Sequence, residues 1–84
     1  MSKKRRDKFF AKISGSTKNV TFNNMIKLFE MFDAEIEPPR RGSHYKIRLN
    51  AYKLTLPRPH GKHVDEVYVK KAISIFEEIM ENEE

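Results

Sequence analysis

The clearest pattern in this chain is a run of apolar residues at helical spacing in its first half. The run recurs at intervals of three and four positions: Phe22, Met25, Ile26, Phe29 and Phe32. That spacing places the side chains on one face of a helix, which we expect to be buried in the core. Thr21 precedes the run as a favourable N-cap, and Val20 and Met25 are spaced as a hydrophobic staple. The pattern predicts a helix over about residues 22–33.

A second run of the same kind lies near the C-terminus: Val69, Ala72, Ile73, Phe76 and Met80. Asp65 is the corresponding N-cap, and Val64 and Val69 are spaced as a second staple. The pattern predicts a helix over about residues 66–81, followed by an acidic tail, residues 82–84, that is expected to fray.

Between the two predicted helices the pattern changes to a period of two, which is typical of β-strands. From residue 44 to residue 49 the two faces alternate: Tyr45, Ile47 and Leu49 on one, His44, Lys46 and Arg48 on the other. A turn at Asn50-Ala51 and a further alternation up to Pro57 predict the second arm of a hairpin. Residues 34–37 precede Pro38-Pro39 and predict a short edge strand, because proline cannot donate a hydrogen bond to a ladder.

The expected order of elements is therefore (α)-α-β-β-β-α. This is an α+β fold in which two helices cover one face of a small three-stranded antiparallel sheet. In the basic N-terminal segment, residues 1–19, a narrow apolar stripe predicts only a short, loosely held helix followed by a loop. We expect a single domain over residues 1–84, with its core in residues 20–81.

Composition and charge narrow the choice of ligand. A chain of 84 residues with 38% hydrophobic content fills one small core, so a shallow site for a polymer is favoured over a deep pocket. The net charge is +5, but residues 1–75 carry all 17 Lys and Arg against 7 Asp and Glu, and 5 Glu follow. A body this basic suggests an anionic partner such as nucleic acid.

Several classes of protein are disfavoured by what the sequence lacks. It contains no cysteine, which excludes disulfides and thiolate zinc sites. It also shows no apolar run of about 18 residues and no short apolar region with a cleavage site, so we expect no membrane and a reducing cytoplasm. His60 and His63 are spaced to share a metal ion with Asp65 or Glu66. The neighbouring Gly and Lys residues favour a basic loop instead, and we expect no metal and no small-molecule cofactor.

One histidine lies among cations at the start of the predicted second strand. Histidine has the unperturbed pKa nearest neutral pH, so an exposed imidazole can transfer a proton while neighbouring cations hold phosphate. RNA is cleaved by its own 2′-hydroxyl when a base removes that proton and cations stabilise the phosphorane charge. His44 is therefore the predicted acid/base. The residues expected to bind RNA phosphates are Arg40, Arg41, Gly42, Ser43, Lys46, Arg48, Lys62 and Lys71.

These features also have purely structural interpretations. His44 can be an ordinary exposed strand residue, and Gly42 can serve only to turn the chain. The basic run of residues 3–6 is more often a solvated, disordered tail than a specific contact. Tyr68 falls off the apolar stripe of its helix, where it can stack on a base or half-bury at the sheet edge.

The triplet Gly42-Ser43-His44, placed after a capped helix and a short strand, resembles the HicA toxins of bacterial and archaeal toxin–antitoxin pairs. The likeness covers most of the chain and includes Phe32, KNVTF at residues 18–22 and YVKKA at residues 68–72. The resemblance implies a fold like the double-stranded-RNA-binding domain, cleavage of mRNA without a metal, and silencing by a HicB antitoxin that covers the active site. It also implies that His44, the histidine of the triplet, is catalytic.

The chain departs from the commonest form of that family in two places. Tyr45 stands where many members have a second histidine, and Asn50-Ala51 stands where many have a longer, glycine-containing turn. Tyr45 is expected to point into the core, so the first departure leaves the site intact, whereas the short turn affects substrate preference. Two alternatives stay open: a non-catalytic RNA-binding module of the same fold, and a protein whose basic face chiefly binds an acidic partner such as an antitoxin.

Overall fold

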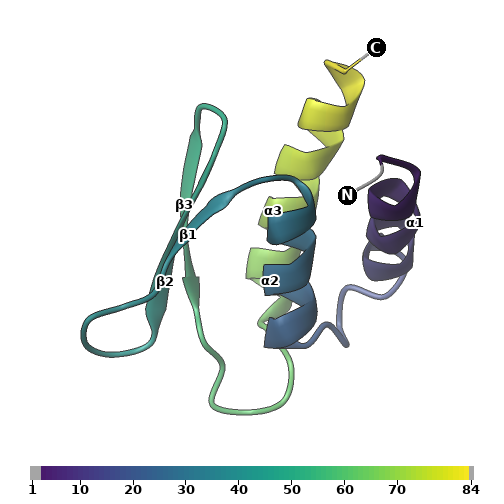
Figure 1. Cartoon of the computed structure of the whole chain (residues 1–84). Helices are drawn as coiled ribbons and strands as arrows, with labels where there is room; N and C mark the ends of the chain where they lie inside the picture. The colour runs from purple at the N-terminus through teal and green to yellow at the C-terminus, as the bar shows by residue number, and fades with distance from the viewer. Residues whose placement is uncertain (1–2, 84) are drawn as a thin grey trace.

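Helices and strands follow one another in the order α-α-β-β-β-α over residues 3–83, the part of the chain that the computed structural model describes (Figure 1). They are α1 (Lys3–Ser14), α2 (Phe22–Met31), β1 (Glu35–Glu37), β2 (His44–Leu49), β3 (Tyr52–Pro57) and α3 (Glu66–Glu81). The predicted α+β class and element order are confirmed. β2 and α3 begin and end at the predicted residues.

The strands form an antiparallel sheet in the order β1-β2-β3, and α2 and α3 cover one of its faces (Figure 1). Side chains in β2 alternate as predicted, because Ile47 and Leu49 are buried while His44 is exposed. The opposite face, which we call the polar sheet face, carries the outward side chains of Glu35, Glu37, His44, Lys46, Arg48, Lys53 and Thr55.

α2 and α3 both begin at the predicted caps. The Thr21 hydroxyl accepts a hydrogen bond from the backbone N–H of Asn24 at 3.2 Å, and the Asp65 carboxylate accepts one from Val67 at 3.1 Å. The C-terminal end of α2 differs from the prediction, since the helix ends at Met31 and not at residue 33. Asp33 takes a left-handed conformation with φ of 63°, which reverses the chain direction and leads it into β1.

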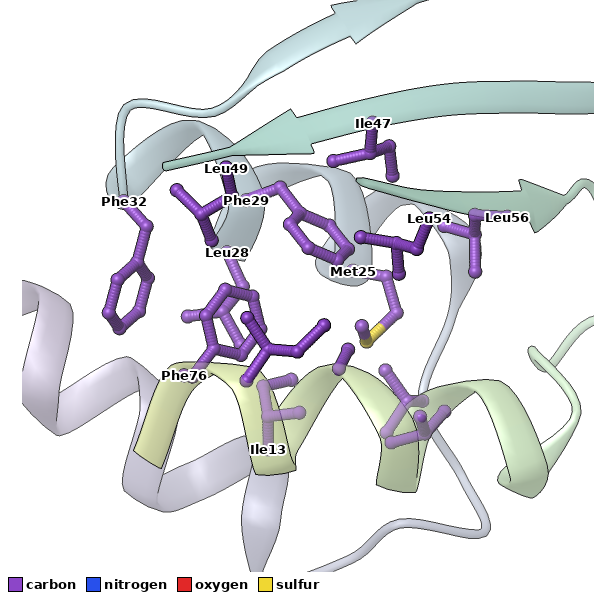
Figure 2. Packing of buried hydrophobic residues seen from close by; sticks show 14 of the residues in the cluster. Ile13, Met25, Leu28, Phe29, Phe32, Ile47, Leu49, Leu54, Leu56 and Phe76 are labelled. Carbon is purple, nitrogen blue, oxygen red and sulfur yellow. The ribbon is translucent and has the colours of Figure 1, made fainter. Parts of the chain in front are cut away.

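The core lies between the sheet and the helices, with Phe29 and Phe76 fully buried near its centre (Figure 2). The aromatic residues of the first predicted stripe are all buried: Phe22, Phe29 and Phe32. The buried face of α2 is wider than that stripe, because Leu28 and Met31 are also buried. α2 packs against α1 as well as against the sheet side, so it needs apolar residues on more than one face.

The N-terminal helix is firmly packed, which corrects the expectation that it is loosely held. Phe10 and Ile13 are buried, and the Phe10 ring meets the Phe76 ring edge-on with 6.1 Å between centroids. α3 therefore contacts α1 as well as the sheet-side core. Its buried face is accordingly shifted from the predicted stripe: Ile75 and Ile79 are buried, whereas Ile73 and Met80 are only half-buried.

The basic run of residues 3–6 is helical, and the expectation of a solvated tail is wrong for Arg6. Its side chain is buried, and its Nη1 donates a hydrogen bond to Glu83 Oε2 at 2.7 Å while Nη2 donates to the other carboxylate oxygen. The guanidinium also lies 4.3 Å from the ring centre of Phe32. The expected fraying of residues 82–84 thus does not extend to the side chain of Glu83, and residue 84 lies outside the described residues.

Candidate functional site

His44 is the first residue of β2, opposite Pro57 of β3, and its side chain is exposed on the polar sheet face. Its orientation follows from its neighbour. The Tyr45 ring packs against the Phe22 ring with 4.9 Å between centroids, which fixes the inward face of the strand at that point. Alternation then turns His44 outward, as predicted from the sequence.

The two residues before His44 fix the backbone that carries it. Gly42 has φ of +79°, a conformation that L side chains rarely adopt, and a Cβ added there would meet no atom within 4 Å. The glycine is therefore required for the turn and not for a close contact within the chain. The Ser43 carbonyl accepts a hydrogen bond from the backbone N–H of Arg58 at 2.7 Å, which continues the β2–β3 pairing beyond His44.

His44 borders a shallow depression of about 440 Å³ beside the β1–β2 loop. Its lining includes cations that the sequence predicted to lie near the histidine: Arg40, Arg41 and Lys46. Arg40 and Arg41 are exposed, and within residues 3–83 neither side chain forms a hydrogen bond or an ion pair. Glu37 also lines the depression, so a carboxylate faces the same space as the cations.

The polar sheet face carries acidic residues that reasoning from the sequence did not connect to the site. In the register of the sheet, Glu37 lies opposite Lys46 and Glu35 opposite Arg48. The Arg48 Nη1 lies 3.8 Å from Glu35 Oε2, an exposed pair that contributes little to stability. Its main effect is to lower the positive charge that the face presents to a ligand.

Lys53 is a further cation of this face and was also missed. Lys53 of β3 lies directly opposite Arg48 of β2 in the register of the sheet. It also lines a second depression of the polar sheet face together with Lys46 and Thr55. The signal was present in the sequence. Alternation in residues 52–57 sends Lys53 outward in the same way that it sends His44 outward.

The remaining predicted phosphate ligands lie elsewhere. Lys62 lines a separate depression of about 260 Å³ with Arg58 and the first residues of α2. Its lining includes none of the Gly42-Ser43-His44 triplet, although the backbone N–H of Arg58 donates a hydrogen bond to the Ser43 carbonyl. Lys71 is exposed on α3, which covers the apolar face of the sheet, so the structure does not bring it to the polar sheet face.

Nothing within residues 3–83 holds the His44 imidazole by a hydrogen bond or an ion pair. The carboxyl groups whose pKa is shifted lie outside the site: the Thr17 hydroxyl lowers the pKa of Glu66, and Arg6 lowers that of Glu83. A catalytic imidazole is usually oriented by a third group, so in this chain that orientation would have to come from the bound substrate. Because the residue is exposed, a polymer can approach its side chain.

In the part of the chain that the structure describes, no three His, Asp, Glu or Cys side chains gather in a metal-binding arrangement. His63 forms an isolated β-bridge with Thr21, which joins the leads into α3 and α2 through their backbones. No helix among the described residues combines the length and apolar character needed to cross a membrane.

Comparison with known proteins assigns no family: no family model, curated protein or solved structure matches this chain.

Proposed function

We propose that this chain is a metal-independent endoribonuclease that cleaves mRNA in the cytoplasm, the toxin of a toxin–antitoxin pair that a HicB-like antitoxin silences. The observation that carries the proposal is the exposed imidazole of His44 in a shallow depression with Arg40 and Arg41, whose side chains have no partner within residues 3–83. The likeness of the Gly42-Ser43-His44 segment to the HicA toxins supports the same assignment.

In the proposed reaction, neutral His44 removes the proton from a ribose 2′-hydroxyl, and the 2′-oxygen attacks the adjacent phosphorus. The bond from phosphorus to the 5′-oxygen breaks, leaving a 2′,3′-cyclic phosphate and a 5′-hydroxyl. Arg40 and Arg41 stabilise the negative charge of the phosphorane, and Lys46, next on the same strand face, donates a proton to the departing oxygen. No metal takes part in these steps.

Cleavage of labelled mRNA in the presence of EDTA tests the proposal. We expect wild-type protein to release fragments with 2′,3′-cyclic phosphate ends, and His44→Ala to cleave at least about 100-fold more slowly, since a positioned acid/base contributes about 10²–10⁴-fold. RNA affinity should change by less than about twofold in this variant, because one neutral side chain contributes little to phosphate binding. His60→Ala is the matched control, an exposed histidine of the β3–α3 loop that should leave cleavage unchanged.

Two results would contradict the proposal. One is wild-type protein that leaves every RNA intact, and the other is His44→Ala protein that cleaves as fast as wild type. The first result, combined with salt-sensitive RNA binding, would support a non-catalytic RNA-binding module. The observation that favours this second candidate is the lack, within residues 3–83, of any group that orients the His44 imidazole.

A further inference from the structure

A further concave surface is formed by residues of α1 and α2. α1 lies on the side of α2 and α3 that is away from the sheet (Figure 1). This groove of about 460 Å³ is lined by Arg5, Lys8, Phe9, Lys12, Lys27 and Met31. None of these residues belongs to the sheet or to the loop that carries Arg40 and Arg41. The groove is therefore separate from the His44 depression, and its function does not depend on RNA cleavage.

The groove has an apolar floor and a cationic rim. Phe9 is half-buried and Met31 is buried, while Lys8, Lys12 and Lys27 are exposed. No carboxylate is among the lining residues, in contrast to the depression beside His44. Lysines whose stems border apolar surface while their ammonium groups stay in water present a site that attracts both apolar groups and anions.

The spacing on α1 matches recognition of a helix. Arg5, Lys8, Phe9 and Lys12 occupy positions i, i+3, i+4 and i+7, which form one continuous strip along the helix. A partner helix lying along this strip can alternate carboxylates and apolar side chains at the same intervals, which is how amphipathic helices fill grooves. Lys27 supplies a cation from α2 on the other side of the groove.

Nucleic acid fits this groove less well. The lining contains no hydroxyl or amide side chain to read a base edge, and Met31 and Phe9 form a floor that a phosphate cannot use. The Lys27 ammonium lies 5.0 Å from the ring centre of Phe9, so it already occupies one face on which a base would stack.

A second copy of this chain also fits poorly. Its acidic helix end, with Glu77, Glu78 and Glu81 exposed, matches the charge of the groove. However, Ile79 of that segment is buried in its own core, and the only large hydrophobic residue that is exposed among residues 3–83 is Val67, at the opposite end of α3. The acidic end therefore has no fully exposed apolar side chain to place on Phe9.

We propose that the groove between α1 and α2 binds an acidic amphipathic helix of a partner protein. In the complex, apolar side chains of the partner lie on Phe9 and Met31, and its carboxylates pair with Lys8, Lys12 and Lys27. The apolar contacts hold the helix in place, and the ion pairs at the rim set its orientation and accelerate its association.

The test uses full-length protein and a fluorescein-labelled peptide that is designed to be helical, with leucines along one face and glutamates on both sides of it. Fluorescence anisotropy should report binding that Lys8→Glu and Lys27→Glu each weaken by about tenfold, since each variant turns an attraction at the rim into a repulsion. Lys4→Glu is the matched control, because Lys4 is an exposed lysine of α1 that does not line the groove. It should weaken binding by less than about threefold, through long-range charge alone. Circular dichroism verifies that each variant is folded.

Three outcomes would overturn the proposal. A peptide of the same composition with its leucines scattered around the helix should bind at least about tenfold more weakly, and equal binding would show that only charge is recognised. Equal effects of Lys4→Glu and Lys8→Glu would lead to the same conclusion. If wild-type protein self-associates and Lys8→Glu makes it monomeric, the occupant is a second copy and not a partner helix.

Discussion

Arg6 and Arg41 are the same residue type in opposite situations. Arg6 is only 8% exposed, with its guanidinium on the Phe32 ring and its N–H groups bonded to the Glu83 carboxylate. Arg41 is exposed beside His44 and forms no hydrogen bond or ion pair within residues 3–83. One arginine is used by the fold, and the other is available to a ligand.

The difference shows that the number of cations in the sequence is larger than the number available to bind an anion. Part of the basic N-terminal segment neutralises the acidic C-terminal end, because Arg6 bonds to Glu83 and Lys3 Nζ lies 3.4 Å from the same carboxylate. Part of the polar sheet face is neutralised by Glu35 and Glu37. The cations that remain for RNA in the proposed site are concentrated at Arg40 and Arg41.

The largest expected effect is a difference in stability between the variants Arg6→Ala and Arg41→Ala. Arg6→Ala should lower the free energy of unfolding by about 1–2 kcal/mol, because it removes both the packing on Phe32 and the charge-assisted bonds to Glu83. Arg41→Ala should change it by less than about 0.5 kcal/mol, as expected for an exposed residue. Urea unfolding followed by circular dichroism measures both. Equal effects of the two substitutions would show that the Arg6 pair does not hold α1 in solution.

The second effect is a pH dependence of the same contact. The Arg6 guanidinium lowers the pKa of Glu83 to about 2, from its ordinary value of 4.5. Because the pKa is lower in the folded chain, the pair stabilises the protein above about pH 4.5, and this contribution is lost as the pH falls toward about 2. The difference in stability between wild type and Glu83→Gln should therefore be constant near neutral pH and shrink under acid.

Thermal unfolding at a series of pH values measures that difference. Glu81→Gln is the control, since it removes the same charge from the same end of α3 without touching Arg6. If wild type and Glu83→Gln differ equally at all pH values, the carboxylate is not held by Arg6 in the folded protein.

The sequence predicted the features that depend on residues close together in the chain, and it did not predict those that depend on distant residues. Local features were predicted correctly: the ends of β2 and α3, and the caps at Thr21 and Asp65. Each of them depends on residues that are near one another in the sequence. The packing of α1 was not. It depends on Arg6 and Glu83, which are 77 positions apart, and no local pattern shows which carboxylate an arginine will meet.

The same distinction applies to the candidate site. Alternation along β2 was enough to place His44 and Lys46 on one exposed face. The presence of Glu37 opposite Lys46 depends on the register between β1 and β2, which two separate strands decide together. The sequence therefore predicted that Lys46 shares the face of His44, but it did not show the carboxylates that reduce the charge of that face.

The smallest expected effect tests whether those carboxylates limit RNA binding. Glu37→Gln removes a negative charge from the lining of the His44 depression, so RNA affinity at low salt should rise by about two- to fivefold. Stability should change by less than about 0.5 kcal/mol, because this side chain is exposed and lies opposite a lysine that is exposed as well.

The control is Glu30→Gln, which changes an exposed carboxylate of α2 outside that lining and should raise RNA affinity less. Fluorescence anisotropy with a labelled RNA at two salt concentrations provides the measurement, and the gain should shrink at the higher one because salt screens the repulsion. An unchanged affinity for Glu37→Gln would mean that RNA phosphates do not approach this depression, and the role proposed for Arg40 and Arg41 would fail with it.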